Sequence, residues 1–113
     1  MSYRNEFGSN FDLGFNLNDF PYLKDKSWHN DVCPSFYFNV GTKYYVLWID
    51  YSELAKRDGS NDRYLVQEAT NEGDEKHPEI YSSDGNIIFE GELFTDLNQF
   101  LNNITSLQDP NVS

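Results

Sequence analysis

Residues 35–51, SFYFNVGTKYYVLWIDY, constrain the fold more than any other stretch of this chain. In the first half Phe36, Phe38 and Val40 occupy every second position, which is the spacing of a β-strand with one buried face. After the turn VGT, residues 43–51 are mostly apolar at successive positions, which predicts a strand covered on both faces. We therefore expect a β-hairpin whose second strand lies in the centre of a sheet.

Three further segments have the pattern of extended chain. Residues 63–70, RYLVQEAT, predict a third strand. Within residues 80–92 the pair Asp84-Gly85 separates two extended runs, and this pair accepts the positive φ angles of a tight turn, so we expect a second hairpin there. Between residues 11 and 17, apolar side chains alternate with polar residues and glycine. That alternation predicts a short edge strand, and a loose N-terminal tail is the alternative.

The last apolar pattern is helical. Thr95 can cap the start of a helix, because its hydroxyl accepts a hydrogen bond from a free amide of the first turn. One helical face then carries Leu97, Phe100, Leu101, Ile104 and Leu107. Strands followed by one amphipathic helix predict an α+β fold, with an antiparallel β-sheet of about five strands and the C-terminal helix packed on one face. We expect residues 1–113 to form a single domain, with residues 1–10 and 108–113 loose.

Charge limits the partners that the protein can have. Nineteen Asp and Glu residues against eight Lys and Arg give a formal net charge of −11. This charge repels nucleic acid and anionic membranes, and it favours a basic protein as the partner. The longest apolar run, residues 44–49, is too short to span a membrane. A single cysteine, and an amino terminus without the apolar core of a signal peptide, predict a cytoplasmic protein.

One stretch, residues 27–36, groups side chains that are chemically reactive. It contains a histidine, an aspartate and the only cysteine of the chain, which are residue types that nucleophilic catalysis uses. Neighbours on one loop rarely reach the required geometry, and no nearby cation would activate the thiol. We therefore interpret the stretch as a structural motif that ties an irregular loop to the sheet, and we do not expect an enzyme. The motif consists of Trp28, His29, Asn30, Asp31, Cys33 and Pro34.

The sequence also predicts neither a metal site nor a cofactor. Two histidines and one cysteine are too few for a zinc site with fixed ligand spacing. The seven glycines are dispersed, and none begins a phosphate-binding loop.

Acidic residues are concentrated between positions 68 and 92, where eight carboxylates accompany a single lysine. A solvated surface that keeps the protein soluble is the simplest interpretation. Like charges repel one another over about 8 to 10 Å, however, so a fold gains no stability from gathering them. A cationic partner would relieve that repulsion. We predict that this acidic surface binds the partner through Glu68, Glu72, Asp74, Glu75, Glu79, Asp84, Glu90 and Glu92, with Tyr81 as an aromatic anchor.

Residues 20–104 also carry a resemblance to a known class of proteins. The stretches 28–31 (WHND), 33–36 (CPSF) and 47–51 (LWIDY), with Asp96-Leu97 in the C-terminal helix, resemble small acidic bacterial immunity proteins. These proteins are partners of contact-dependent growth inhibition or polymorphic toxins. The resemblance implies a cytoplasmic bacterial protein that binds a cognate toxin domain directly, often a nuclease, and neutralises it.

Other functions are compatible with the same sequence. The acidic surface would also suit a phage-type anti-restriction or anti-CRISPR protein that mimics nucleic acid. A cysteine-dependent enzyme would use Cys33 with His29 or His77. An adaptor subunit would join other proteins through its aromatic surface, and a sheet edge could pair two copies in a homodimer.

Overall fold

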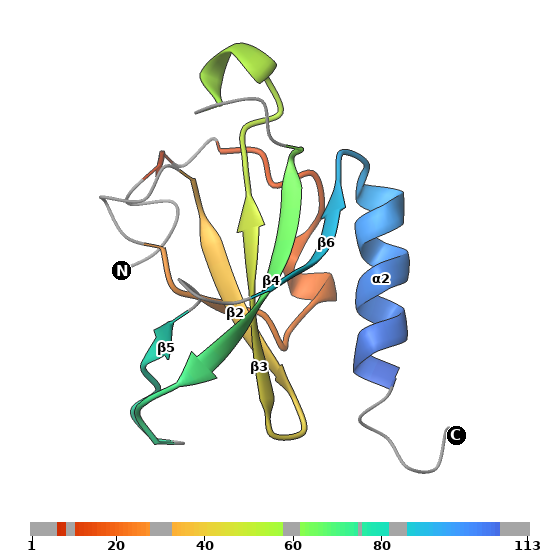
Figure 1. The fold of residues 1–113 in the computed structure, drawn as a ribbon. Coiled ribbons are helices and arrows are strands. Elements are labelled where there is room, and N and C mark those ends of the chain that lie inside the picture. The colour runs from red at the N-terminus through yellow and green to blue at the C-terminus, as the bar shows by residue number, and fades with distance from the viewer. Residues whose placement is uncertain are drawn as a thin grey trace.

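The computed structural model describes residues 7–8, 11–27, 33–57, 62–74, 76–81 and 86–106. Its elements are η1 (Leu17–Asp19), β1 (Lys24–Asp25), β2 (Ser35–Val40), β3 (Lys43–Ile49), η2 (Leu54–Lys56), β4 (Tyr64–Asn71), β5 (Ile80–Tyr81), β6 (Ile87–Gly91) and α2 (Phe94–Ser106). The six strands form one curled antiparallel sheet in the order β1-β2-β3-β4-β5, with β6 also paired to β4. The helix α2 packs beside β6 (Figure 1). The predicted α+β fold is confirmed.

The predicted hairpin of β2 and β3 is confirmed, and so is the central place of β3 in the sheet. The pairing runs from Ser35 opposite Trp48 to Val40 opposite Lys43. Gly41 closes the turn with φ +62°, a left-handed conformation that favours glycine. Strand β3 lies between β2 and β4, and residues on both of its faces are buried, as Val46 and Leu47 show. Both faces of β3 are therefore covered at its centre.

The core lies between one face of the sheet and the segments that cover it. Leu97 and Leu101 of α2 are fully buried in this core. The N-terminal segment, residues 11–23, adds Leu13, Phe20 and Leu23 to the same cluster. Aromatic rings join these parts, since Phe15 stacks on Phe94 with ring centroids 5.0 Å apart. No helix in the described parts of the chain is long and apolar enough to cross a membrane.

The edge strand expected over residues 11–17 is not formed. These residues are irregular up to η1, and the sheet edge belongs to β1 instead. Gly14 has φ +87° and its amide donates a hydrogen bond to the Asp12 carboxylate, which bends the chain locally. The apolar residues of the segment therefore pack on the core without joining the sheet. Of residues 1–10, predicted to be loose, only Phe7 and Gly8 are described, and residues 108–113 lie outside the described chain.

The hairpin expected around Asp84-Gly85 is wrong. Strands β5 and β6 both pair antiparallel with β4, β5 with its last two residues and β6 with its first four. The reversal of chain direction occurs earlier, between the end of β4 and the start of β5. With eight residues, β4 is long enough to form backbone hydrogen bonds with both short strands. The sequence does not indicate that the two strands share this partner. Asp84 and Gly85 themselves lie outside the described residues.

The helix begins at Phe94, so that Thr95 is not its cap but lies in its first turn. The amide of Leu97 donates to the carbonyl of Leu93 at 3.3 Å. The apolar stripe agrees with the predicted face, and its last member, Leu107, lies outside the described residues.

Candidate partner-binding site

The loop of residues 71–79, here called the acidic loop, is held in shape by two of its own polar side chains. The Asn71 side-chain oxygen accepts hydrogen bonds from the amides of Gly73 at 2.9 Å and Glu79 at 3.0 Å. The amide of Glu72 donates to the carbonyl of Glu79 at 2.8 Å, which extends the ladder of β4 and β5. Asn71 thus joins the two ends of the loop, and a fixed loop loses less conformational entropy on binding.

The tip of the acidic loop is fixed by Asp74. Its Oδ1 atom accepts hydrogen bonds from the amides of Lys76 at 2.9 Å and His77 at 2.6 Å. The imidazole Nδ1 of His77 lies 3.8 Å from the same oxygen, and 87% of the His77 side chain is exposed. Asp74 therefore organises the turn, while His77 extends into solvent.

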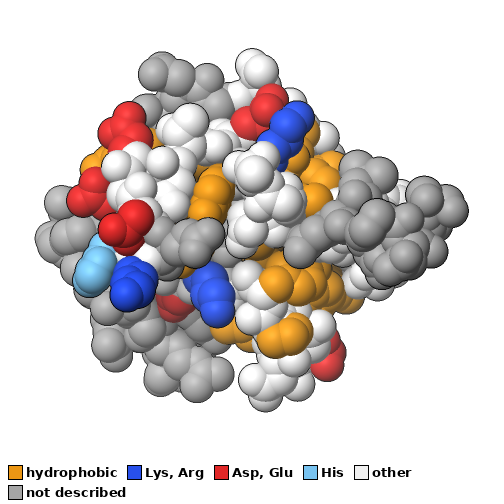
Figure 2. All heavy atoms as spheres, turned by 90° about the horizontal axis from the view of Figure 1, so that it is seen from below, with side chains coloured by type: hydrophobic (Ala, Val, Ile, Leu, Met, Phe, Trp, Pro, Cys, Tyr) orange, Lys and Arg blue, Asp and Glu red, His pale blue; other side chains and the backbone are white. Residues whose placement is uncertain are grey.

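The other two described carboxylates of the acidic loop face solvent. Glu72 and Glu79 are both exposed, and neither forms an ion pair with any described residue. Figure 2 shows acidic side chains gathered at the left edge of the molecule, beside a histidine and a lysine or arginine. The loop is thus a preorganised surface of negative charge.

A groove of about 520 Å³ borders the acidic loop. Its sides come from two distant parts of the chain, because the curled sheet brings β1 and β5 to the same place. Tyr37, Lys26 and Asp25 form one side, and Glu79 and Tyr81 belong to the other. Tyr81 is 52% exposed. The groove places two aromatic rings next to the carboxylates of the acidic loop.

Strand pairing separates two predicted acidic residues, Glu90 and Glu92, from the acidic loop. Glu90 lies opposite Leu65, near the start of β4, whereas the acidic loop follows the end of this strand. At the rise of a β-strand the two places are about 20 Å apart, more than a screening length. The window of residues 68–92 therefore does not form one continuous acidic surface among the described residues.

Glu92 has a partner within the fold. Both of its oxygens accept hydrogen bonds from the Arg57 guanidinium at 2.7 Å. Only 1% of the Arg57 side chain is exposed, against 47% for Glu92. The hydrogen bonds to Arg57 lower the pKa of Glu92, and the same bonds raise the pKa of Arg57. The pair connects the end of η2 to the end of β6. Glu92 therefore has a structural role within the fold.

The other predicted contact residues are less informative. Glu68 is half-buried on β4, and its carboxylate accepts a hydrogen bond from the Asn86 side chain at 3.2 Å. Glu75 and Asp84 lie outside the described residues. Sequence reasoning missed Asp25, Lys26 and Tyr37, because only the curl of the sheet brings them to β5, and strands of two residues leave no readable pattern.

The predicted structural motif is described only in its second half. Trp28, His29, Asn30 and Asp31 lie outside the described residues. Pro34 is fully buried, and its carbonyl accepts a hydrogen bond from the Ile49 amide at 3.0 Å. Cys33 is 4% exposed, so its thiol is shielded from solvent. Within the described residues, no three His, Cys, Asp or Glu side chains are grouped so as to hold a metal ion.

Comparison with known proteins finds no matching family model, no similar curated protein and no similar solved structure.

Proposed function

We propose that this protein binds a basic partner protein through the acidic loop and the neighbouring groove. One observation supports this best: Asn71 and Asp74 fix the loop, while the carboxylates of Glu72 and Glu79 stay exposed and form no ion pair with a described residue. A fold gains nothing from such an arrangement, because the exposed charges repel one another. The negative charge raises the association rate of a cationic partner. Because the loop is already fixed, binding needs little reorganisation.

The partner that we propose is a bacterial toxin domain, which makes the protein an immunity protein. A nuclease toxin holds a polyanionic substrate with lysine and arginine side chains. Carboxylates on a fixed loop can bind the same lysine and arginine side chains that bind the phosphates, through charge-assisted hydrogen bonds. The resemblance of the chain to small acidic immunity proteins supports this choice of partner.

The groove supplies the apolar part of such an interface. Binding energy at protein interfaces is concentrated in a few aromatic or arginine side chains surrounded by polar contacts. Tyr81 and Tyr37 lie in the groove, and Glu79 borders it. We therefore expect Tyr81 to contribute more to affinity than any single carboxylate.

The alternatives receive less support. A nucleic-acid mimic needs carboxylates spaced along one extended face. Glu90 instead pairs near the start of β4, which the rise per residue of a β-strand places about 20 Å from the acidic loop. Cysteine-dependent catalysis requires a thiol that substrate can reach, and Cys33 is 4% exposed.

The test is a binding measurement between this protein and the toxin domain encoded beside its gene. We expect a one-to-one complex whose affinity falls as the salt concentration rises. The matched variants carry the same change in net charge: Glu72→Gln with Glu79→Gln in the acidic loop, and Asp19→Asn with Glu90→Gln elsewhere. Only the loop pair should weaken binding. A gene without a neighbouring toxin, or equal effects of both variants, would contradict the proposal.

A further inference from the structure

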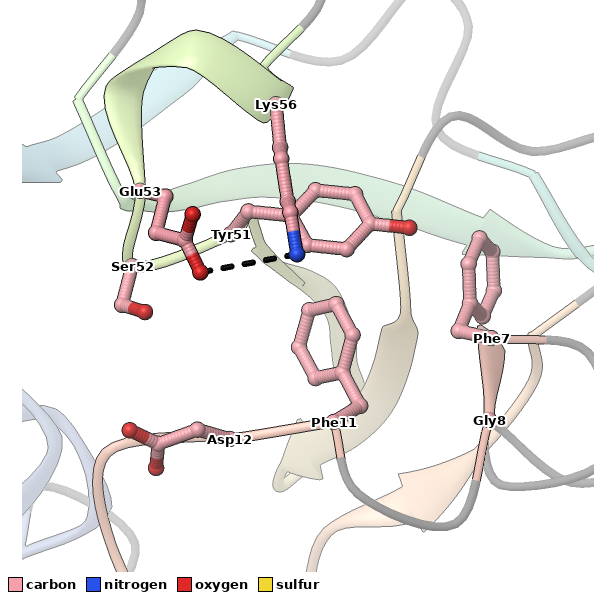
Figure 3. A pocket seen from close by; sticks show the side chains of 8 residues that line it. All are labelled: Phe7, Gly8, Phe11, Asp12, Tyr51, Ser52, Glu53 and Lys56. Atoms are coloured by element: carbon pink, nitrogen blue, oxygen red, sulfur yellow. Dashed lines mark ion pairs between the residues drawn. The ribbon is translucent and has the colours of Figure 1, made fainter.

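A second pocket, of about 410 Å³, opens beside η2. Figure 1 shows η2 at the top of the molecule and the turn between β4 and β5 at the bottom, so the pocket lies far from the acidic loop. One side of the pocket is aromatic, formed by Phe7, Phe11 and Tyr51. Asp12 and Glu53 lie on the other side, and the Lys56 side chain lies between Glu53 and Tyr51 in the view of Figure 3.

The aromatic side is assembled from two parts of the chain. The rings of Phe11 and Tyr51 are tilted against each other with centroids 4.8 Å apart, and Phe7 meets Phe11 edge-on at 6.1 Å. All three residues are half-buried, so they present part of their ring surface to the pocket. The face of an aromatic ring is negative and attracts a cation placed over it.

Two carboxylates lie across the opening from these rings. Figure 3 shows an open space bounded by Asp12, Ser52 and Glu53 on one side and by the Phe11 ring on the other. The side chains of Asp12 and Glu53 are 69% and 66% exposed. Asp12 is held by the Gly14 amide at 2.8 Å and has Arg63 at 3.6 Å. Glu53 is the less restrained of the two carboxylates.

A cation of the chain itself already lies at this place. The Lys56 ammonium is 3.4 Å from Glu53, and 58% of the lysine side chain is exposed. An ion pair this exposed adds little to stability, so an incoming cation can replace it. Lysine is also a poor match for the site, because its compact ammonium cannot lie flat on a ring.

We propose that this pocket receives an arginine side chain from a partner protein. A guanidinium is planar, so it stacks on an aromatic ring while its N–H groups donate to a carboxylate. Phe11 and Tyr51 supply the ring surface, and Glu53 supplies the carboxylate. The proposal goes beyond the proposed function: it concerns another end of the molecule and holds whether or not the acidic loop binds a toxin.

The first experiment uses N-acetyl-arginine amide as the probe, with the neutral isostere N-acetyl-citrulline amide as its control. Backbone amide signals are followed by NMR at constant ionic strength. We expect saturable shifts at residues 11–12 and 51–53 in the millimolar range, as suits a ligand of this size. Citrulline should bind about fivefold more weakly, since it lacks the charge that both Glu53 and the aromatic rings attract. Equal binding of both probes, or shifts confined to other residues, would overturn the proposal.

The second experiment compares two exposed neighbours whose variants should act in opposite directions. Glu53→Gln should weaken binding of the arginine probe about fivefold, because one charge pair is lost. Lys56→Gln should strengthen it about twofold, because the competing ammonium is removed. Glu90→Gln is the control, since it changes the net charge as Glu53→Gln does but on β6, outside both the pocket and the acidic loop. A loss of affinity with Lys56→Gln, or equal losses with Glu53→Gln and Glu90→Gln, would contradict an arginine site beside η2.

Discussion

The hydroxyl of Tyr64 donates a hydrogen bond to the backbone carbonyl of Leu13 at 2.7 Å, although the two residues are 51 positions apart in the chain. This contact attaches the N-terminal segment to β4 at a place where Tyr64 is fully buried. Burial also raises the pKa of the Tyr64 phenol, so the hydroxyl stays protonated and able to donate. The bond connects a segment without regular structure to the central part of the sheet.

Tyr64→Phe should destabilise the protein by about 1 to 2 kcal/mol, because it leaves the carbonyl of Leu13 without its donor. Tyr22→Phe is the control, since the hydroxyl of Tyr22 forms no hydrogen bond with a described residue. Urea unfolding measures both changes. Equal stability of the two variants would show that the segment does not depend on this bond.

Gly14→Ala should destabilise the protein more than Gly41→Ala, although both glycines have positive φ angles, +87° and +62°. A Cβ atom at Gly14 would collide with the Tyr64 hydroxyl, whereas at Gly41 it would meet nothing within 4 Å. Gly41→Ala should therefore cost only the backbone term of about 1 kcal/mol. Gly14→Ala should exceed it by about 1 kcal/mol or more through overpacking. Thermal unfolding of the two variants measures the difference.

Glu92→Gln should lower the free energy of unfolding by about 1 to 3 kcal/mol near neutral pH. The variant removes the carboxylate charge that pairs with the buried Arg57 guanidinium, and the exposure of Glu92 reduces the loss below that of a fully buried pair. The pKa of Glu92 is below its ordinary value of 4.5 in the folded state. The contribution of the pair is therefore present above pH 4.5 and is lost as pH falls through the folded pKa.

The measurement for this pair is a series of unfolding curves from pH 7 downwards for the wild type and for Glu92→Gln. The difference in stability between them should shrink as the solution becomes acidic. A difference that stays constant down to low pH would show that Arg57 does not depend on the charge of Glu92.

The hairpin of β2 and β3 could be predicted from the sequence because its information is local. Alternating residues such as Phe36 and Phe38 identify the strand, and the apolar run of β3 identifies its central place. The same rule failed at residues 11–17, where Leu13 and Phe15 alternate in order to pack on the core and not to join the sheet. Alternation reports which side chains are buried, but it does not report whether the backbone finds a partner strand.

The candidate site was predictable only in part, for a related reason. The charge of Glu72 and Glu79 can be read directly from the sequence, and the structure exposes both. Lys26 and Tyr37 share a groove with Glu79 only through the curl of the sheet, which depends on contacts between distant residues. The sequence places Glu92 with the other acidic residues, because no local pattern indicates that it pairs with Arg57, 35 positions away.

Cys33 should react slowly with a thiol reagent in the folded protein, since only 4% of the residue is exposed. A thiol in this position reacts when the structure opens, so the rate should rise steeply with urea. The measurement is the reaction rate with an aromatic disulfide reagent in increasing urea. A fast reaction in the absence of urea would contradict the shielding and would restore cysteine chemistry as an alternative.

The central claim is that the acidic loop binds a basic toxin domain, and calorimetric titration tests it most directly. The toxin domain encoded beside the gene is titrated with the wild type, with Glu72→Gln/Glu79→Gln and with Asp19→Asn/Glu90→Gln, at low and at high salt. We predict a one-to-one complex that weakens with salt and that loses about tenfold or more in affinity only in the loop variant, as two lost charge pairs imply. No heat of binding at low salt, or a complex that is indifferent to the loop variant, would contradict the claim.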